Sequence, residues 1–313
     1  MKICILGAGA LGSAIGGTLA EAGSEVYLIN RREEYVNNIN TKGLVLRNGT
    51  TDRTVKVQAR TDCTGIGPVD LIIVLVKSFH TKEAIANAGE LIGDQTIIMS
   101  LQNGLGNEEA LAEVVGKEHL LGGKTYVGGV MLSPGHVLAG TKNKYTYIGE
   151  LDGVISDRVT RVADVFSKAG LSTVVSHNII GVIWDKLLIN VATGALSGIT
   201  RLPYGGLYNV PEIRDCAFEA ILEGIAVAKA NGVVLVTEDP EEIWLKAAEG
   251  LPAEFKTSIL QSLEKGSITE IDDINGTIVR WGEKYNISTP VNRLLVAGIK
   301  GIEYRIKNYG EKA

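Results

Sequence analysis

The chain has 313 residues, of which 45% are hydrophobic and 21% are charged. This balance is ordinary for a globular enzyme and excludes a disordered or fibrous protein. The length predicts roughly two domains. The net charge of −5 comes without a long run of basic residues, so we expect no nucleic-acid partner.

The three cysteines, Cys4, Cys63 and Cys216, are far apart in the sequence. They form no CxxC motif and no cluster with histidine, so we expect neither a disulfide framework nor a metal site. Residues 3–20 form an uncharged stretch, but its glycines make a poor membrane-spanning helix. We therefore expect a soluble, cytoplasmic protein with no membrane partner.

Strand-like and helix-like segments alternate through the first half of the chain. Continuous apolar strands separated by helices indicate a parallel sheet covered on both faces. Two further short runs could add edge strands to it. The predicted strands are 2–6, 25–30, 71–77, 96–101, 146–149 and 171–175, and the predicted helices are 10–22, 80–92, 107–115 and 154–169.

After residue 176 the helical periodicity takes over and strand-like runs disappear. Ser267 and Glu270 fit a capping box at the start of one helix, and Pro290 fits the first turn of another. We therefore predict an α/β domain over residues 1–175 and an all-helical domain over 176–313. The predicted helices of the second half are 179–197, 210–231, 239–249, 253–265, 269–285 and 289–308.

The first predicted strand leads into a glycine-rich turn that matches G-x-G-x-x-G. It consists of Gly7, Ala8, Gly9, Ala10, Leu11 and Gly12. The match lies between a predicted strand and a predicted helix, in a βαβ unit of about 30 residues, which is the context that the motif requires. Gly7 permits the tight turn, Gly9 lets the backbone approach a pyrophosphate, and Gly12 lets the helix pack on the strand. The helix N-terminus then attracts the phosphates, so the motif predicts a Rossmann-type dinucleotide site.

The residues that follow the second predicted strand indicate which nicotinamide cofactor is bound. Sites for NAD usually carry an acidic residue there, whereas this chain has Asn30-Arg31-Arg32. Arg31 can pair with a ribose 2′-phosphate, which predicts NADPH over NADH. The sequence leaves open whether Arg32 binds ligand or is a solvated charge. Lys77 and Asn103 follow two further strands and are expected to face the cofactor, because ligands bind beyond the carboxyl ends of such strands.

Lys186 and Asn190 are spaced one helical turn apart and share a face of an apolar helix. Leu187–Ile189 flank the lysine, and desolvation would lower its pKa and make it a usable general acid. The alternative is a snorkelling lysine beside a solvated asparagine. Glu270 precedes two aspartates, and the pattern alone supports only a capping role.

Several short motifs occur in order along the chain. They are GAGALG at 7–12, an arginine after the second strand, VK at 76–77, QNG at 102–104, WDKLLIN at 184–190, TEIDDINGTIV at 269–279 and W-G-x-x-x-x-I-x-T-P-x-N at 281–292. In the order and spacing of these motifs, the chain resembles the ketopantoate reductase (2-dehydropantoate 2-reductase) family over nearly its whole length. The resemblance implies a Rossmann-type domain, a helical C-terminal domain, and NADPH-dependent reduction of a 2-keto acid in the cleft.

The resemblance also assigns roles to residues. It places the family's catalytic lysine at Lys186, its first substrate-binding asparagine at Asn190, its active-site glutamate at Glu270 and its carboxylate-binding serine at Ser258. Lys186 would bind substrate as well as donate a proton. Lys77, Asn103 and Glu270 would contact the cofactor. With ketopantoate as substrate, the product would be D-pantoate, a precursor of coenzyme A.

Two positions depart from the family pattern. Gly194 and Tyr204 stand where the family commonly has further substrate-binding asparagines. Losing such hydrogen bonds can change the preferred substrate. The alternatives are therefore a paralogous reductase of another 2-keto acid, an opine-type condensing enzyme, and an NADPH-sensing protein without turnover. The amphipathic helices of the second domain are compatible with a homodimer interface or with a core.

Overall fold

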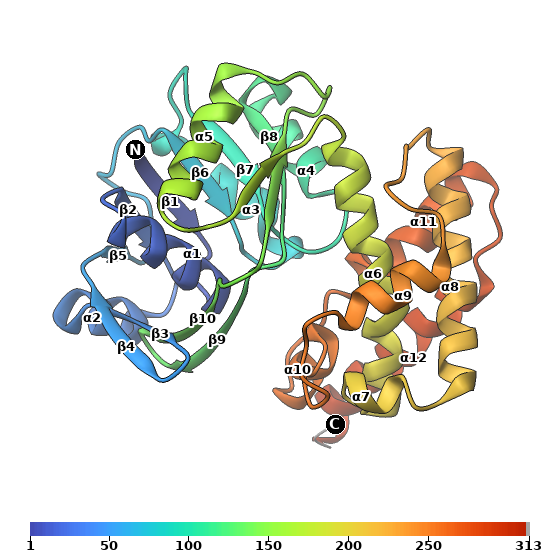
Figure 1. Ribbon diagram of the computed structural model, residues 1–313. Coiled ribbons are helices and arrows are strands. Elements are labelled where there is room, and N and C mark those ends of the chain that lie inside the picture. Colours follow the sequence, from blue (N-terminus) through green and yellow to red (C-terminus); the bar gives the residue numbers. More distant parts are fainter. Residues whose placement is uncertain (311–313) are drawn as a thin grey trace. The chain divides into compact units, whose positions relative to one another are not determined.

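The structure, a computed structural model, describes residues 1–310. The chain divides into two compact units. The first comprises Met1–Gln102 and Gly106–Ile179, and the second comprises Asn103–Leu105 and Ile180–Ala313. Figure 1 shows the strands in the first unit and the helical build of the second. The predicted fold class, a mostly parallel sheet with helices followed by a helical part, is confirmed.

The main sheet of the first unit has eight strands in the order β12-β11-β8-β7-β6-β1-β2-β5. Its neighbours pair in parallel, except that β8 and β11 are antiparallel. The strands are β1 (Lys2–Leu6), β2 (Glu25–Ile29), β5 (Gln58–Arg60), β6 (Leu71–Val74), β7 (Ile97–Ser100), β8 (Leu120–Thr125), β11 (Thr146–Gly149) and β12 (Thr173–Val175). All six strands predicted from the sequence are therefore present.

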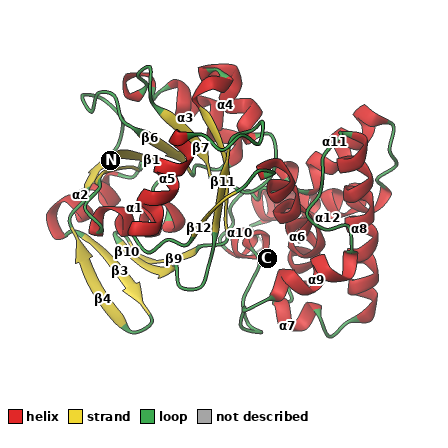
Figure 2. Ribbon diagram, turned by 45° about the horizontal axis from the view of Figure 1, so that its top comes forward, coloured by secondary structure: helices red, strands yellow, loops and turns green. Residues whose placement is uncertain are grey.

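A second sheet, which the sequence did not predict, has four strands in the order β4-β3-β10-β9. These are β3 (Leu44–Asn48), β4 (Thr51–Val55), β9 (Gly128–Ser133) and β10 (His136–Gly140). Figure 2 shows them in yellow near helix α1 (Ala10–Glu21). A Cβ added at Gly16 would lie 2.7 Å from Cδ2 of Leu28, and one at Gly17 would lie 2.6 Å from Cδ2 of Leu44. Helix α1 is rich in glycine because side chains of both sheets press against it.

The remaining helices of the first unit cover both faces of the main sheet. Helix α5 (Asp157–Lys168) buries Val159, Val162 and Phe166 in the same apolar cluster as α1. Helix α4 (Asn107–Val115) buries Leu111 in the cluster on the other face. The others are α2 (Glu33–Lys42), α3 (Thr81–Ala86) and the 3-10 helices η1 (Ser78–His80), η2 (Gly89–Leu91) and η3 (Lys117–His119).

The second unit is built around helix α6 (Ile179–Thr200). A Cβ added at Gly224 of α8 would lie 2.5 Å from Leu188, and one at Gly198 would lie 2.7 Å from Ile299 of α12, so both helices pack closely on α6. Among the described residues, α6 is the one helix apolar and long enough to cross a membrane, but 78% of its most apolar window is buried. The other helices are α7 (Tyr204–Leu207), α8 (Pro211–Ala230), α9 (Pro240–Ala248), α10 (Ser258–Glu264), η4 (Ile271–Asp273), α11 (Asn275–Tyr285) and α12 (Pro290–Tyr309).

The helix predicted over residues 269–285 is present only from Asn275 onward, and its predicted start and capping box are wrong. Glu270 precedes the 3-10 helix η4 and makes no side-chain capping bond, and α11 begins only at Asn275. The physical reason is that the carbonyl oxygen of Asp273 accepts a hydrogen bond from Leu105 N at 3.2 Å instead of from a residue of its own helix. The chain therefore bends between the glutamate and α11. Helix α10 also starts later than predicted, at Ser258.

Candidate active site

The glycine-rich turn is held against the end of β2. The amides of Gly7 and Ala8 both donate to the carbonyl oxygen of Ile29, at 3.2 and 2.8 Å. Gly7 has φ +99°, and a Cβ there would lie 2.4 Å from the Val76 amide nitrogen. A Cβ at Gly12 would lie 2.6 Å from the Gly7 carbonyl oxygen. The fold therefore requires glycine at both positions, for the turn and for the close approach of α1.

Gly9 differs from its neighbours in the turn. Its φ is −76°, which any residue can adopt, and a Cβ there would have nothing within 4 Å. The fold places no demand for glycine at this position. Open space at the N-terminus of a buried helix is what a pyrophosphate group needs for close backbone approach.

The residues after β2 brace this turn. Asn30 Nδ2 donates to the carbonyl oxygen of Ala8 at 2.8 Å, and Asn30 Oδ1 accepts from Arg32 N at 3.0 Å. Sequence reasoning missed this role of Asn30. The Arg31 side chain is 65% exposed, and its Nη1 lies 4.0 Å from Glu83 Oε2. Such a pair contributes little to stability and leaves the guanidinium open to an anionic ligand.

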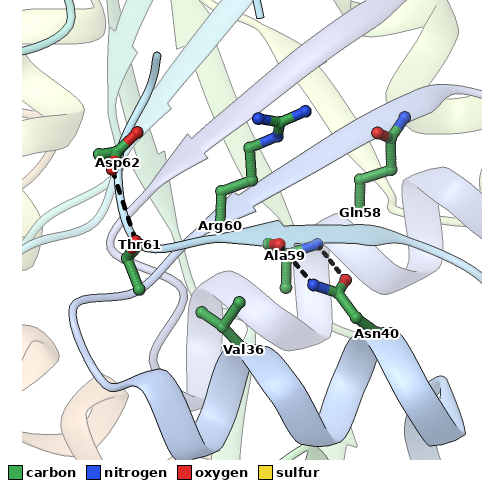
Figure 3. A pocket seen from close by; sticks show the side chains of 7 residues that line it. All are labelled: Val36, Asn40, Gln58, Ala59, Arg60, Thr61 and Asp62. Carbon is green, nitrogen blue, oxygen red and sulfur yellow. Dashed lines mark hydrogen bonds between the residues drawn. The ribbon is translucent and has the colours of Figure 1, made fainter. Parts of the chain in front are cut away.

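A depression of about 470 Å³ lies at the outer edge of the main sheet (Figure 3). There the Asn40 side chain receives a hydrogen bond from Ala59 N at 3.0 Å and donates to Ala59 O at 2.9 Å. The amide thus takes the place of a neighbouring strand for β5. These contacts close an exposed sheet edge and bring no candidate catalytic residue into the depression.

Lys77 and Asn103 follow β6 and β7, as predicted. Lys77 is exposed and precedes η1. Asn103 is half-buried and begins the short segment that belongs with the second unit. There Gly104 has φ +81°, and its Cβ would lie 2.5 Å from the Asp273 carbonyl oxygen. The segment carrying Asn103 therefore packs against η4, directly after Glu270.

A buried lysine that the sequence did not single out lies near this segment. Lys124 on β8 is 2% exposed, and its Nζ donates to the Gln102 carbonyl oxygen at 2.5 Å. The Gln102 side chain donates to Val76 O and to Thr81 Oγ1, both at 2.8 Å. Burial raises the pKa of Glu108, and the charge of Lys124 works against that rise. Lys124 therefore anchors the residue that leads into Asn103.

Replacing Lys124 by Met should destabilise the protein by about 2 kcal/mol, because it removes a buried hydrogen bond to a charged group. Urea denaturation followed by circular dichroism measures the loss. The variant Lys124→Met/Glu108→Gln should recover part of it, since a neutral amide does not need the ammonium nearby. An unchanged denaturation midpoint in Lys124→Met would contradict the anchoring role.

Helix α6 carries Lys186 and Asn190 on one face, and both are half-buried. The residues just before them fix the helix: Trp184 packs edge-to-face on Trp281 at 5.6 Å between ring centroids, and buried Asp185 pairs with Lys246 at 2.7 Å. Asn190 Nδ2 is buried and has no hydrogen-bond partner among the described residues. A buried donor without an acceptor is costly, which makes this amide a candidate for binding a ligand.

Ser258 and Glu270 belong to the same unit as α6. Ser258 is the exposed first residue of α10, and the next residue, Ile259, packs over Gly194 of α6. Glu270 is buried and directly precedes η4, and α11 begins five residues later at Asn275. The α11 residue Asn275 donates to Val191 O at 3.4 Å, beside Asn190. Helices α10 and α11 thus contact α6 at Gly194 and at Val191.

Two asparagines of the C-terminal motifs have a structural role. Asn275 Nδ2 donates to Asn292 Oδ1 at 2.9 Å, and both residues are fully buried. Asn292 Nδ2 in turn donates to Glu223 Oε2 at 2.7 Å. This network joins α8, α11 and α12, and it explains why these positions carry amides inside an apolar core.

A glycine-rich turn on a mostly parallel sheet, together with a helical unit that carries a lysine and an unpaired amide, defines a class: a two-domain, dinucleotide-dependent oxidoreductase. Comparison with protein families identifies the family within this class. The model of ketopantoate reductase PanE/ApbA matches residues 3–153, and its C-terminal model matches residues 178–303. The chain belongs to the ketopantoate reductase PanE/ApbA family and is an oxidoreductase that acts on CH–OH groups.

Curated relatives and solved structures agree with this assignment. The chain is 37% identical to the 2-dehydropantoate 2-reductase of Pyrococcus horikoshii over 97% of this chain and 98% of the relative. It is similar to a PanE/ApbA family ketopantoate reductase from Ralstonia eutropha, with 35% identity, a TM-score of 0.90 and coverage of 98% and 100%. It is also similar to D-mandelate dehydrogenase solved with NADH and anilino(oxo)acetate, with 27% identity, a TM-score of 0.91 and the same coverage.

Proposed function

We propose that this protein reduces 2-dehydropantoate (ketopantoate) to D-pantoate with NADPH, as a cytoplasmic enzyme of pantothenate and coenzyme A biosynthesis. Its similarity to 2-dehydropantoate 2-reductases supports the reaction. The observation that carries the proposal for this chain is the face of α6, where Lys186 stands one turn before the unpaired amide of Asn190. A proton donor and a hydrogen-bond donor side by side suit a carbonyl group that becomes an alkoxide.

We place the cofactor site in the α/β domain predicted from the sequence, residues 1–175, with a contribution from Glu270 of the helical domain. Two solved neighbours are complexes with NADH, which supports a nicotinamide cofactor. The open backbone at Gly9 fits the pyrophosphate, and exposed Arg31 fits a 2′-phosphate. The proposed cofactor-binding residues are Gly7, Ala8, Gly9, Ala10, Leu11, Gly12, Arg31, Lys77, Asn103 and Glu270.

The chemistry of the carbonyl group is proposed for residues of the helical domain, 176–313. When bound, the reduced nicotinamide supplies a hydride to C2 of the keto acid. Lys186, as an ammonium ion, stabilises the charge that develops on the carbonyl oxygen and gives that oxygen its proton. Asn190 Nδ2 donates to a substrate oxygen, and the Ser258 hydroxyl binds the carboxylate. Glu270 orients Lys186.

Steady-state kinetics test this proposal. We expect NADPH to be oxidised in the presence of ketopantoate, and we expect D-pantoate as the product on a chiral column. Tight NADPH binding without oxidation by any keto acid would instead support a nucleotide-sensing protein. Turnover that requires an added amino acid would support an opine-type condensation.

Replacing Arg31 by Ala should raise the KM for NADPH roughly tenfold or more and leave the KM for NADH nearly unchanged, because only NADPH carries the 2′-phosphate. Arg161→Ala is the control, since Arg161 is an exposed arginine of α5 that has no predicted role in cofactor binding. Equal changes for both cofactors in Arg31→Ala would remove Arg31 from this role.

A further inference from the structure

Two buried hydroxyl groups, those of Ser13 and Tyr35, lie next to the glycine-rich turn. Ser13 is in the first turn of α1 and is fully buried, and Tyr35 is in the first turn of α2 and is 3% exposed. Ser13 Oγ lies 2.5 Å from the Gly9 carbonyl oxygen and 2.5 Å from the Tyr35 hydroxyl. The tyrosine ring belongs to an apolar cluster, so its hydroxyl depends on this contact to offset the loss of water.

The hydrogen bonds between these groups run in one direction. A carbonyl oxygen can only accept, so Ser13 Oγ gives its single proton to the Gly9 carbonyl oxygen, which is nearer than that of Ala8 at 3.4 Å. The Tyr35 hydroxyl therefore donates to Ser13 Oγ. Burial raises the pKa of Tyr35 to about 12, and the bond with Ser13 works against this rise. The phenol keeps its proton at neutral pH and remains a donor.

This chain of donors fixes the peptide between Gly9 and Ala10. The Gly9 carbonyl oxygen also accepts from Ser13 N at 2.9 Å, so the serine binds it twice. In a planar trans peptide the C=O and N–H bonds point in opposite directions. The Ala10 amide therefore points away from Ser13 and off the N-terminus of α1, where amides have no acceptor within the helix. A Cβ at Gly9 would have nothing within 4 Å, so there is open space beside this peptide.

We propose that Tyr35, acting through Ser13, is a positioning residue for the cofactor, and that it fixes the Gly9–Ala10 peptide so that the Ala10 amide donates to the pyrophosphate. This inference rests on the proposed function, which assigns the pyrophosphate to this turn. A serine inside a helix often bonds the carbonyl oxygen four residues earlier. The tyrosine adds a second element that holds the serine hydroxyl in one orientation. A chain of donors also polarises the peptide, which strengthens its N–H group as a donor.

The test is fluorescence titration of NADPH and of NADH with the variant Tyr35→Phe, which keeps the buried ring and removes only the hydroxyl. We expect the Kd to rise roughly threefold to tenfold, and by the same factor for both nucleotides, because both carry the pyrophosphate. The kcat at saturating cofactor and keto acid should stay within about twofold, since only binding is affected. A rise confined to NADPH overturns the inference, because the tyrosine would then act on the 2′-phosphate. A lower Tm with an unchanged Kd also overturns it, because the role would then be purely structural.

Two further variants test whether the tyrosine acts through the serine. Ser13→Ala interrupts the chain of donors with a residue that favours a helix, and it should raise the Kd at least as much as Tyr35→Phe. The double variant should bind no more weakly than Ser13→Ala alone, whereas additive losses would show that Tyr35 acts independently and would contradict the inference. Tyr27→Phe is the matched control, because this tyrosine is 8% exposed and its hydroxyl donates to Glu25 Oε1 at 2.7 Å. Its Kd should be unchanged.

The titration also separates this inference from the proposed function. If the unaltered protein binds neither nucleotide, the inference and the proposed function both fail. If the unaltered protein binds NADPH and reduces ketopantoate while Tyr35→Phe binds both nucleotides equally well, the inference alone is overturned.

Discussion

Replacing Lys186 by Ala should lower kcat by roughly 10²–10⁴-fold, the usual contribution of a positioned general acid. The half-buried lysine stands one turn before Asn190, on a helix fixed by the Trp184–Trp281 contact. In the proposed mechanism, removing Lys186 takes away both the proton and the positive charge that stabilises the developing alkoxide. The measurement is single-turnover oxidation of NADPH with saturating keto acid, which separates the chemical step from product release.

Two variants serve as controls for this expectation. Lys186→Arg retains the charge but cannot readily release a proton, so its kcat should remain low. Lys229→Ala removes an exposed lysine of the same unit that pairs with Glu238, and its kcat should be unchanged. NADPH affinity should be similar in all three proteins by fluorescence titration. A loss of less than about tenfold in Lys186→Ala would show that another group donates the proton.

Substitutions at Gly9 and Gly7 should have large but different effects. Gly9→Val should raise the KM for NADPH roughly tenfold or more with little change in Tm, because the side chain meets open space in the protein but blocks the approach of a pyrophosphate. Gly7→Ala should lower Tm as well, because its Cβ would lie 2.4 Å from the Val76 amide nitrogen at a φ of +99°. Thermal unfolding and cofactor titration measure the two effects separately.

The contrast between these glycines is the informative result. If Gly9→Val binds NADPH as well as the unaltered protein, the pyrophosphate does not cross the turn at this residue. If Gly9→Val unfolds at a much lower temperature, the glycine serves the fold. Gly23→Ala is a reference for conformational strain alone, because Gly23 has φ +94° and open space around it.

The main sheet and the large helices follow from patterns within single segments. Runs such as Leu71–Val74 and Ile97–Ser100 are buried on both faces, so they are continuously apolar and easily recognised. The second sheet lacks this signal. Strands β4 and β9 are mostly exposed, and β10 pairs with β3 from a distant part of the chain. The apolar residues of this sheet form a cluster only in the folded protein, where they pack against α1.

In the candidate site, too, some residues could be found from local sequence and others depend on contacts between distant segments. Helical spacing placed Lys186 and Asn190 on one face of a helix, and the family resemblance supplied the roles predicted for them. Lys124 was missed because nothing in its neighbourhood along the chain shows that its amine reaches the Gln102 carbonyl oxygen, just beyond the end of the adjacent strand β7. Glu270 was given a capping role because local pattern cannot show that Leu105 takes the Asp273 carbonyl and interrupts the helix.

The bond between Leu105 and Asp273 has a consequence for protein engineering. Because Asn103–Leu105 belong with the helical unit, the backbone passes from one unit to the other at three points along the sequence. A chimera that exchanges only the C-terminal half with a relative would separate Gly104 from the carbonyl against which it fits. Functional hybrids should therefore carry the tripeptide and the C-terminal half from the same parent.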